Sequence, residues 1–116
     1  MGTKFNVTFR PPTSGGKREY ADIHELQVSK QDDAGEKITF AANSHCFVVV
    51  IPRADSLFNT SEKTLHERIT PTTDYVTETI KVDAEVGNYE YHVFCEEEQD
   101  WGHKPGASPP KIIVTA

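Results

Sequence analysis

The sequence predicts an all-β protein with the short, evenly spaced strands of a β-sandwich. Its 116 residues include 10 valines, 7 isoleucines and 12 threonines, against only 3 leucines and 1 methionine. β-Branched side chains suit a pleated sheet, whereas leucine and methionine dominate the cores of helical proteins. Short apolar runs alternate along the chain with turns rich in proline, glycine and asparagine. The length suits one core, so we expect a single domain over residues 1–116.

Two strands are expected before residue 30. Residues 4–10 alternate between apolar and polar side chains, which places three apolar ones on one face: Phe5, Val7 and Phe9. Residues 11–16 end this strand, because proline cannot donate to a sheet ladder and glycine favours turns. A second strand includes Leu26 and Val28. A helix over residues 20–26 is the alternative for the segment that leads into it, since periodicity alone does not separate the two.

Two further strands are expected between residues 36 and 52. After a turn at residues 34–36, three side chains share one face: Ile38, Phe40 and Ala42. Asn43 and Ser44 break this pattern, and the next strand, residues 45–51, places four side chains on one face: His45, Phe47, Val49 and Ile51. Both faces of residues 47–51 are apolar, which predicts a central strand covered on both sides. Pro52 closes this strand.

Residues 55–69 are the one segment with helical character. Asn59 is a candidate N-cap, and Glu62 stands three residues later, where a capping box places its acid. Leu65 and Ile69 are four residues apart and would face the core from one side of a helix. We therefore expect a short helix or an irregular excursion in this segment.

Three strands are expected after residue 75. Residues 76–82 form the first, with Ile80 and Val82 in the core, and residues 85–88 form a tight turn. The next strand points one set of side chains inward: Tyr89, Tyr91, Val93 and Cys95. Its other set points outward: Glu90, His92 and Phe94. A polar loop over residues 96–110 precedes the last strand, residues 111–115.

Charge and motifs exclude several classes of function. The chain has 12 basic and 18 acidic residues, a net charge of −6 that would repel a phosphate backbone, so we expect no nucleic-acid binding. The longest apolar run, residues 47–52, is far shorter than the ~20 residues that span a bilayer, and we expect neither a membrane span nor a signal peptide. The sequence contains no hydrolase elbow, phosphate-binding glycine loop or metalloprotease motif, so we expect no enzyme activity.

Three segments share a pattern with one known family. Residues 34–45 read Ala-Gly-Glu-Lys-Ile-Thr-Phe-Ala-Ala-Asn-Ser-His, a glycine turn, a strand and an asparagine break before a histidine. Residues 87–95 read Gly-Asn-Tyr-Glu-Tyr-His-Val-Phe-Cys, and Gly-His at 102–103 precedes Pro-Pro-Lys-Ile-Ile-Val at 109–114. This order of segments resembles the cupredoxins, the plastocyanin and azurin family. The resemblance implies an antiparallel Greek-key β-sandwich of cupredoxin type with one short helix or excursion.

The resemblance also implies a mononuclear copper site that transfers single electrons. Residue by residue, it matches His45, Cys95 and His103 with the family's three strong ligands, a donor set that favours copper in both oxidation states. The axial ligand has no match, because Met1 is the only methionine; a carboxylate, Gln99 or a backbone carbonyl would take its place. Seven residues separate Cys95 from His103, where family members have roughly two to four.

Two alternatives concern the same residues. The chain could be a metal-free cupredoxin-like module that binds a protein or a small ligand, with Cys95 as a small buried hydrophobe. Cys46 follows His45 and, in a cupredoxin, would lie close enough to Cys95 for a disulfide. Neighbours on a strand point to opposite faces, however, which favours two free thiols.

The acidic charge bears on the partner. If the resemblance extends to electron transfer, a net charge of −6 predicts a basic redox-partner protein. Trp101 and the acidic loop that begins at Glu96 would form the docking face, and association would weaken with salt. The sequence leaves the oligomeric state open.

Overall fold

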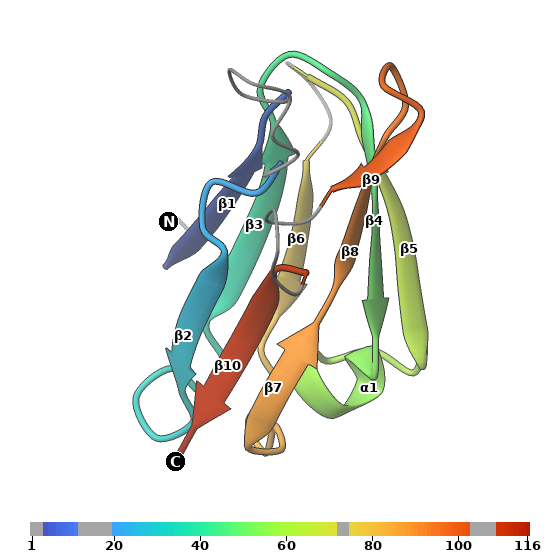
Figure 1. Ribbon diagram of the computed structural model, residues 1–116. Coiled ribbons are helices and arrows are strands. Elements are labelled where there is room, and N and C mark those ends of the chain that lie inside the picture. The colour runs from blue at the N-terminus through green and yellow to red at the C-terminus, as the bar shows by residue number, and fades with distance from the viewer. Residues whose placement is uncertain (1–3, 12–19, 72–74, 103–108) are drawn as a thin grey trace.

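The computed structural model describes residues 4–11, 20–71, 75–102 and 109–116, which form a β-sandwich with one short helix (Figure 1). This confirms the predicted fold class. The elements in chain order are β1 (Phe5–Phe9), β2 (Glu25–Ser29), β3 (Lys37–Ala42), β4 (Phe47–Pro52), α1 (Ala54–Leu57), β5 (Thr64–Ile69), β6 (Val76–Thr79), β7 (Gly87–Glu90), β8 (His92–Cys95), β9 (Asp100–Gly102) and β10 (Lys111–Thr115). Within these ranges, no helix is long and apolar enough to cross a bilayer.

The strands form three sheets arranged in two layers. One layer is the sheet β1-β3-β6. The other combines the sheets β2-β10-β7 and β5-β4-β8-β9, because β7 and β8 follow each other with only Tyr91 between them (Figure 1). The strand pairs are antiparallel except for two, β1 with β3 and β2 with β10. A parallel pair needs a crossover, and β2 in the opposite layer supplies it between β1 and β3.

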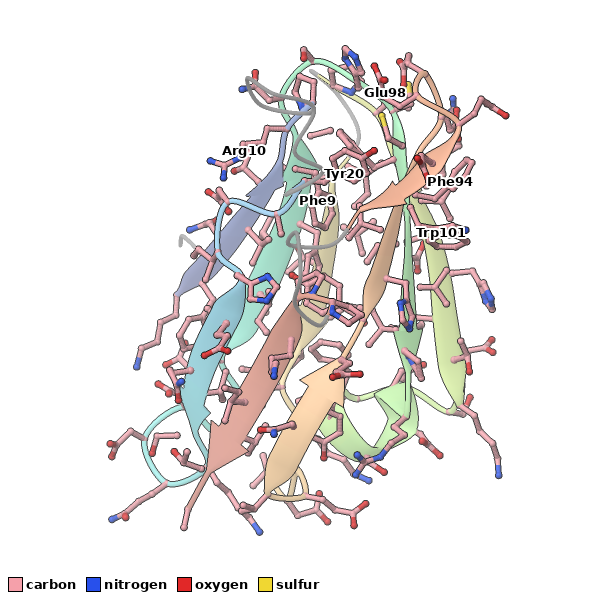
Figure 2. The ribbon with its side chains drawn as sticks, viewed as in Figure 1. Phe9, Arg10, Tyr20, Phe94, Glu98 and Trp101 are labelled. Atoms are coloured by element: carbon pink, nitrogen blue, oxygen red, sulfur yellow. The ribbon has the colours of Figure 1, made fainter. Side chains whose placement is uncertain are left out.

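The core lies between the two layers and is rich in aromatic rings. Phe9 and Phe47 have ring centroids 5.7 Å apart, and Tyr20 lies 5.5 Å from Phe47. Phe40 joins them, stacked on Phe9 at 6.0 Å, and Tyr91 packs edge-on against Phe40. All five side chains are at most 1 % exposed, and Figure 2 shows Phe9 and Tyr20 between the sheets. These rings therefore hold the two layers together.

The alternating segments form strands as predicted. In β1, β3 and β8, the side chains expected inward are buried or, at the ends of strands, half-buried. Strand β10 lies at residues 111–115, as expected, and β2 confirms the strand containing Leu26 and Val28. The helical alternative for residues 20–26 is wrong, since Ala21 bridges to Phe9 and β2 begins at Glu25.

The helical expectation for residues 55–69 is only partly right. Helix α1 is a single turn, and residues 64–69 form strand β5 instead. Asn59 caps no helix, because α1 has already ended at Leu57. Leu65 and Ile69 are both buried, as expected, but on a strand. Residues four apart share a face in either structure, so this spacing does not separate helix from strand.

Four other expectations need correction. Strand β6 ends at Thr79, and Val82 is 66 % exposed rather than in the core. Strand β4 begins at Phe47, so His45 lies in the bend before it. β4 is central, between β5 and β8, but only its inner face is fully buried, because Val48 and Val50 on the outer face are half-buried. The predicted loop after residue 95 contains the strand β9.

Two carboxylates face each other across one open edge of the sandwich. Glu78 on β6 is opposite the fully buried Ile38, and Glu67 on β5 is opposite the fully buried Val49, so both point between the layers. Both are half-buried. Burial and, secondly, the charge of Glu67 raise the pKa of Glu78. Folding therefore shifts the equilibrium of Glu78 toward its protonated form.

We expect Glu78→Gln to stabilise the protein at neutral pH. When folding raises the pKa of a carboxyl group, that group makes its most favourable contribution to stability at pH values below its unfolded-state pKa. This contribution is lost as the pH rises through the folded-state pKa. The gain from the substitution should thus be largest at pH 7–8 and vanish near pH 4. Urea unfolding at both pH values measures it, with the exposed Glu62→Gln as control. An equal gain at both pH values would contradict the assignment.

Candidate metal centre

Of the two predicted ligands that the structure describes, Cys95 is the more deeply buried. It ends β8, opposite Phe47 of β4, and its side chain is 0 % exposed. Burial raises the pKa of the Cys95 thiol, and the nearby backbone N–H groups of Glu98 and Glu97 act in the opposite direction. The turn after β8 therefore partly compensates a thiolate at this position for its loss of water.

Residues 96–99, which we name the acidic turn, join β8 to β9 in a hairpin. Asp100 returns opposite Cys95, and Gly102 opposite Val93. Gln99 has φ +55°, the left-handed conformation that closes such hairpin loops. Its side-chain amide donates to the Glu96 carbonyl at 2.6 Å. The Gln99 side chain is thus hydrogen-bonded within its own turn.

His45 lies beside the acidic turn. The bend between β3 and β4 carries it to the same end of the molecule (Figure 1), and Glu98 of the turn stands there in Figure 2. The His45 side chain is 28 % exposed, with Nε2 4.0 Å from a Glu98 carboxylate oxygen. Its Nδ1 lies 3.3 Å from the Ser44 hydroxyl. One ring nitrogen therefore has a neutral neighbour, and the other an anionic one.

The third predicted ligand, His103, lies outside the described residues. Gly102 precedes it and packs directly on the Tyr20 ring, so closely that a Cβ built on Gly102 would lie 2.0 Å from the Tyr20 Cδ2. Among the residues that the structure describes, no three histidine, cysteine or carboxylate side chains form a group able to hold a metal. Cys95 and His45 are thus placed at one end of the molecule, and the position of His103 stays a prediction.

Cys46 is the second cysteine at this end. Its N–H donates to both carboxylate oxygens of Glu97, at 2.9 and 3.1 Å, and its carbonyl accepts from the Glu96 N–H at 2.9 Å. Burial and the nearby Glu97 charge raise the pKa of its thiol. Both cysteines are free thiols in this structure.

The three glutamates of the acidic turn all have defined neighbours. Glu96 accepts two hydrogen bonds from the Arg68 guanidinium, at 2.8 and 3.0 Å, and this contact lowers the pKa of Glu96. Glu97 binds the Cys46 N–H, and Glu98 faces His45. The sequence analysis did not identify Arg68, because Arg68 and Glu96 are 28 residues apart and no local pattern indicates that they form a pair.

Comparison with solved structures places this architecture in a known fold. A reduced amicyanin variant aligns with 18% identity and a TM-score of 0.51, over 95% of this chain and 80% of its own. A purple cupredoxin from Nitrosopumilus maritimus aligns with 12% identity and a TM-score of 0.51, over 97% of this chain and 100% of its own. No protein-family profile and no curated protein sequence matches. At these identities the likeness concerns the backbone alone: the chain has the cupredoxin fold.

Proposed function

We propose that this protein binds a single copper ion and carries single electrons, with Cys95, His45 and His103 as ligands. The observation that carries the proposal is the environment of Cys95. Cys95 is 0 % exposed, and the backbone N–H groups of Glu98 and Glu97 act on its thiol to lower the pKa that burial raises. A thiolate shielded from water and held by a hairpin turn is suited to bind a soft metal. The fold is shared with amicyanin, one variant of which was solved in a Cu(I) form, and this likeness supports copper as the metal.

The donor set fits copper better than a hard cation. A thiolate with imidazoles favours copper and zinc, whereas carboxylates and carbonyls favour magnesium and calcium. When bound, copper would supply a one-electron couple. Cys95 would hold the metal as thiolate, and His45 would bind through an imidazole nitrogen. Glu98 stands beside His45 and offers a carboxylate oxygen as a fourth donor.

The experiment is a Cu(II) titration followed by visible absorption and EPR. We expect an intense sulfur-to-copper charge-transfer band in the unaltered protein and its loss in Cys95→Ser. Cys46→Ser is the matched control, because it removes the other thiol at the same end and leaves the backbone contacts of Cys46 in place. Circular dichroism of each variant separates loss of the site from loss of the fold.

Three outcomes would argue against this site. A band that survives Cys95→Ser would exclude Cys95 as the ligand. A band lost equally in Cys46→Ser would indicate a site built on both thiols. A blank titration, together with blank metal analysis, would exclude copper binding and leave the metal-free binding module.

A further inference from the structure

The layer that contains β4 splits at the end of this strand farther from the candidate metal centre. β4 pairs with β8 only as far as Val50, and β7 pairs with β10 instead (Figure 1). Continuing the β4–β8 register would set Pro52 opposite Glu90. The Glu96 N–H donates to the Cys46 carbonyl, and hydrogen-bonded pairs alternate along a ladder, so Pro52 and Glu90 would form such a pair. Proline has no N–H to donate, and the ladder therefore ends here.

A hollow of about 420 Å³ lies at this split, a size that suits a small molecule. Its walls are Pro52, Arg53, Asn88, Tyr89, Glu90 and His92. The Tyr91 N–H donates to the Pro110 carbonyl, so every second residue of β7 bonds to β10. The backbone groups of Asn88 and Glu90 therefore point the other way, toward the split. The hollow thus offers backbone carbonyl oxygens as hydrogen-bond acceptors.

Arg53 places a positive charge in the wall of this hollow. Its backbone has φ +56°, a left-handed conformation that glycine adopts with less strain, and such strain is common at ligand sites. Its guanidinium carbon lies 4.6 Å from the centroid of the Tyr89 ring, and one N–H is 3.5 Å from the Asn88 carbonyl oxygen. In the described part of the chain, no carboxylate forms an ion pair with Arg53. The stacked guanidinium therefore keeps N–H groups on its edge for an incoming carboxylate.

Glu90 places a negative charge in the same wall. It is exposed, and it forms no ion pair with Arg53 although both line the hollow. A simple anion would be repelled by Glu90 and by the net charge of −6, and a simple cation would be repelled by Arg53. A zwitterion matches both charges, because its carboxylate pairs with Arg53 while its ammonium donates to Glu90 and to the backbone carbonyls.

We propose that the hollow binds a free α-amino acid, with its carboxylate on Arg53 and its ammonium on Glu90. Pro52 and His92 supply rings to the rest of the wall, which suits an amino acid with an apolar side chain. The hollow lies at the end of β4 opposite to the candidate metal centre, so binding there does not require copper. Its test therefore uses the metal-free full chain, and failure of the copper site leaves the proposal standing.

The test is an NMR titration of the ¹⁵N-labelled full chain with L-leucine at pH 7. We expect saturable shifts at the backbone amides of Arg53, Asn88 and Glu90. Two matched compounds separate the charges of the ligand: N-acetyl-L-leucine lacks the ammonium, and L-leucinamide lacks the carboxylate. Each should bind about tenfold more weakly than L-leucine or worse, because each leaves one charged group of the hollow without its hydrogen-bond partner.

Two substitutions separate the charges of the protein. Arg53→Gly removes the guanidinium at a backbone conformation that glycine adopts freely, and it should weaken L-leucine about tenfold or more without weakening L-leucinamide. Glu90→Gln should weaken L-leucine by a similar factor. The matched control is Glu25→Gln, an exposed glutamate in the same sheet but two strands away, which should leave the affinity unchanged. Circular dichroism of each variant checks that the fold is retained.

Each remaining outcome overturns the proposal. Absence of saturable shifts would show that the hollow does not recognise this chemistry. Equal binding of N-acetyl-L-leucine would reduce the hollow to a site for simple anions. Equal weakening of L-leucine and L-leucinamide by Arg53→Gly would give Arg53 a structural role only. Shifts confined to His45 and the acidic turn would place binding at the other end of the molecule.

Discussion

Phe47→Ala is expected to lower the free energy of unfolding by about 3–5 kcal/mol, the range for large buried aromatic side chains. Phe47 is 0 % exposed and packs on the rings of Phe9 and Tyr20. It is also directly opposite Cys95, so the cavity would open beside the candidate metal ligand. Natural domains are stable by only about 5–15 kcal/mol, so this loss is a large share of the total.

Urea unfolding measures this effect, with circular dichroism and the fluorescence of the single tryptophan as probes. Phe94→Ala is the matched control: the same ring, in the strand next to β4, but half-buried on the outer face. It should cost much less, because removing it leaves no closed cavity. Equal losses for the two variants would contradict the assignment of Phe47 to the centre of the core.

Gly102→Ala is expected to cost about 1–3 kcal/mol, the usual range for overpacking. A Cβ at this position would lie 2.0 Å from Cδ2, 2.6 Å from Cε2 and 2.7 Å from Cγ of Tyr20. These atoms include the inner end of a ring that is only 1 % exposed, so the ring cannot simply turn away. Either β9 or Tyr20 must move, and the hairpin that carries the acidic turn moves with β9.

The series Gly102→Ala and Gly102→Val tests this contact. In an unobstructed strand, valine is more favourable than alanine, and alanine more favourable than glycine. The Tyr20 ring should reverse this order, with valine the least stable of the three by urea unfolding. In a Tyr20→Ala background the cost of Gly102→Ala should fall, and the difference measures the coupling of the two residues. A series that follows strand propensity would contradict the close approach.

The alternation of apolar and polar side chains along the strands explains why so much of the sandwich could be predicted. In β1 and β8, apolar side chains recur at every second position and point into the core. A half-buried strand imposes this period on its sequence, so the sequence reports the buried face directly. Cys95 follows from the same period, because it continues the inward series of Tyr91 and Val93.

Prediction failed where one pattern is compatible with two structures. Leu65 and Ile69 suit one face of a helix as well as one face of β5. The apolar residues on both sides of β4 suggested a strand covered on both faces, but Val48 and Val50 on its outer face are only half-buried. Val82 continued the alternation that begins at Ile80 and yet lies 66 % exposed beyond the end of β6.

By itself, the sequence determined the fold class, the inward face of most strands and the burial of Cys95. Each of these depends on the period of apolar residues within one short segment. Only the tertiary structure decided which distant residues meet: Arg68 with Glu96, Gly102 with Tyr20, and Phe94 with Trp101. The physical reason is that such contacts follow from strand register and layer packing, which bring together segments that carry no local record of each other.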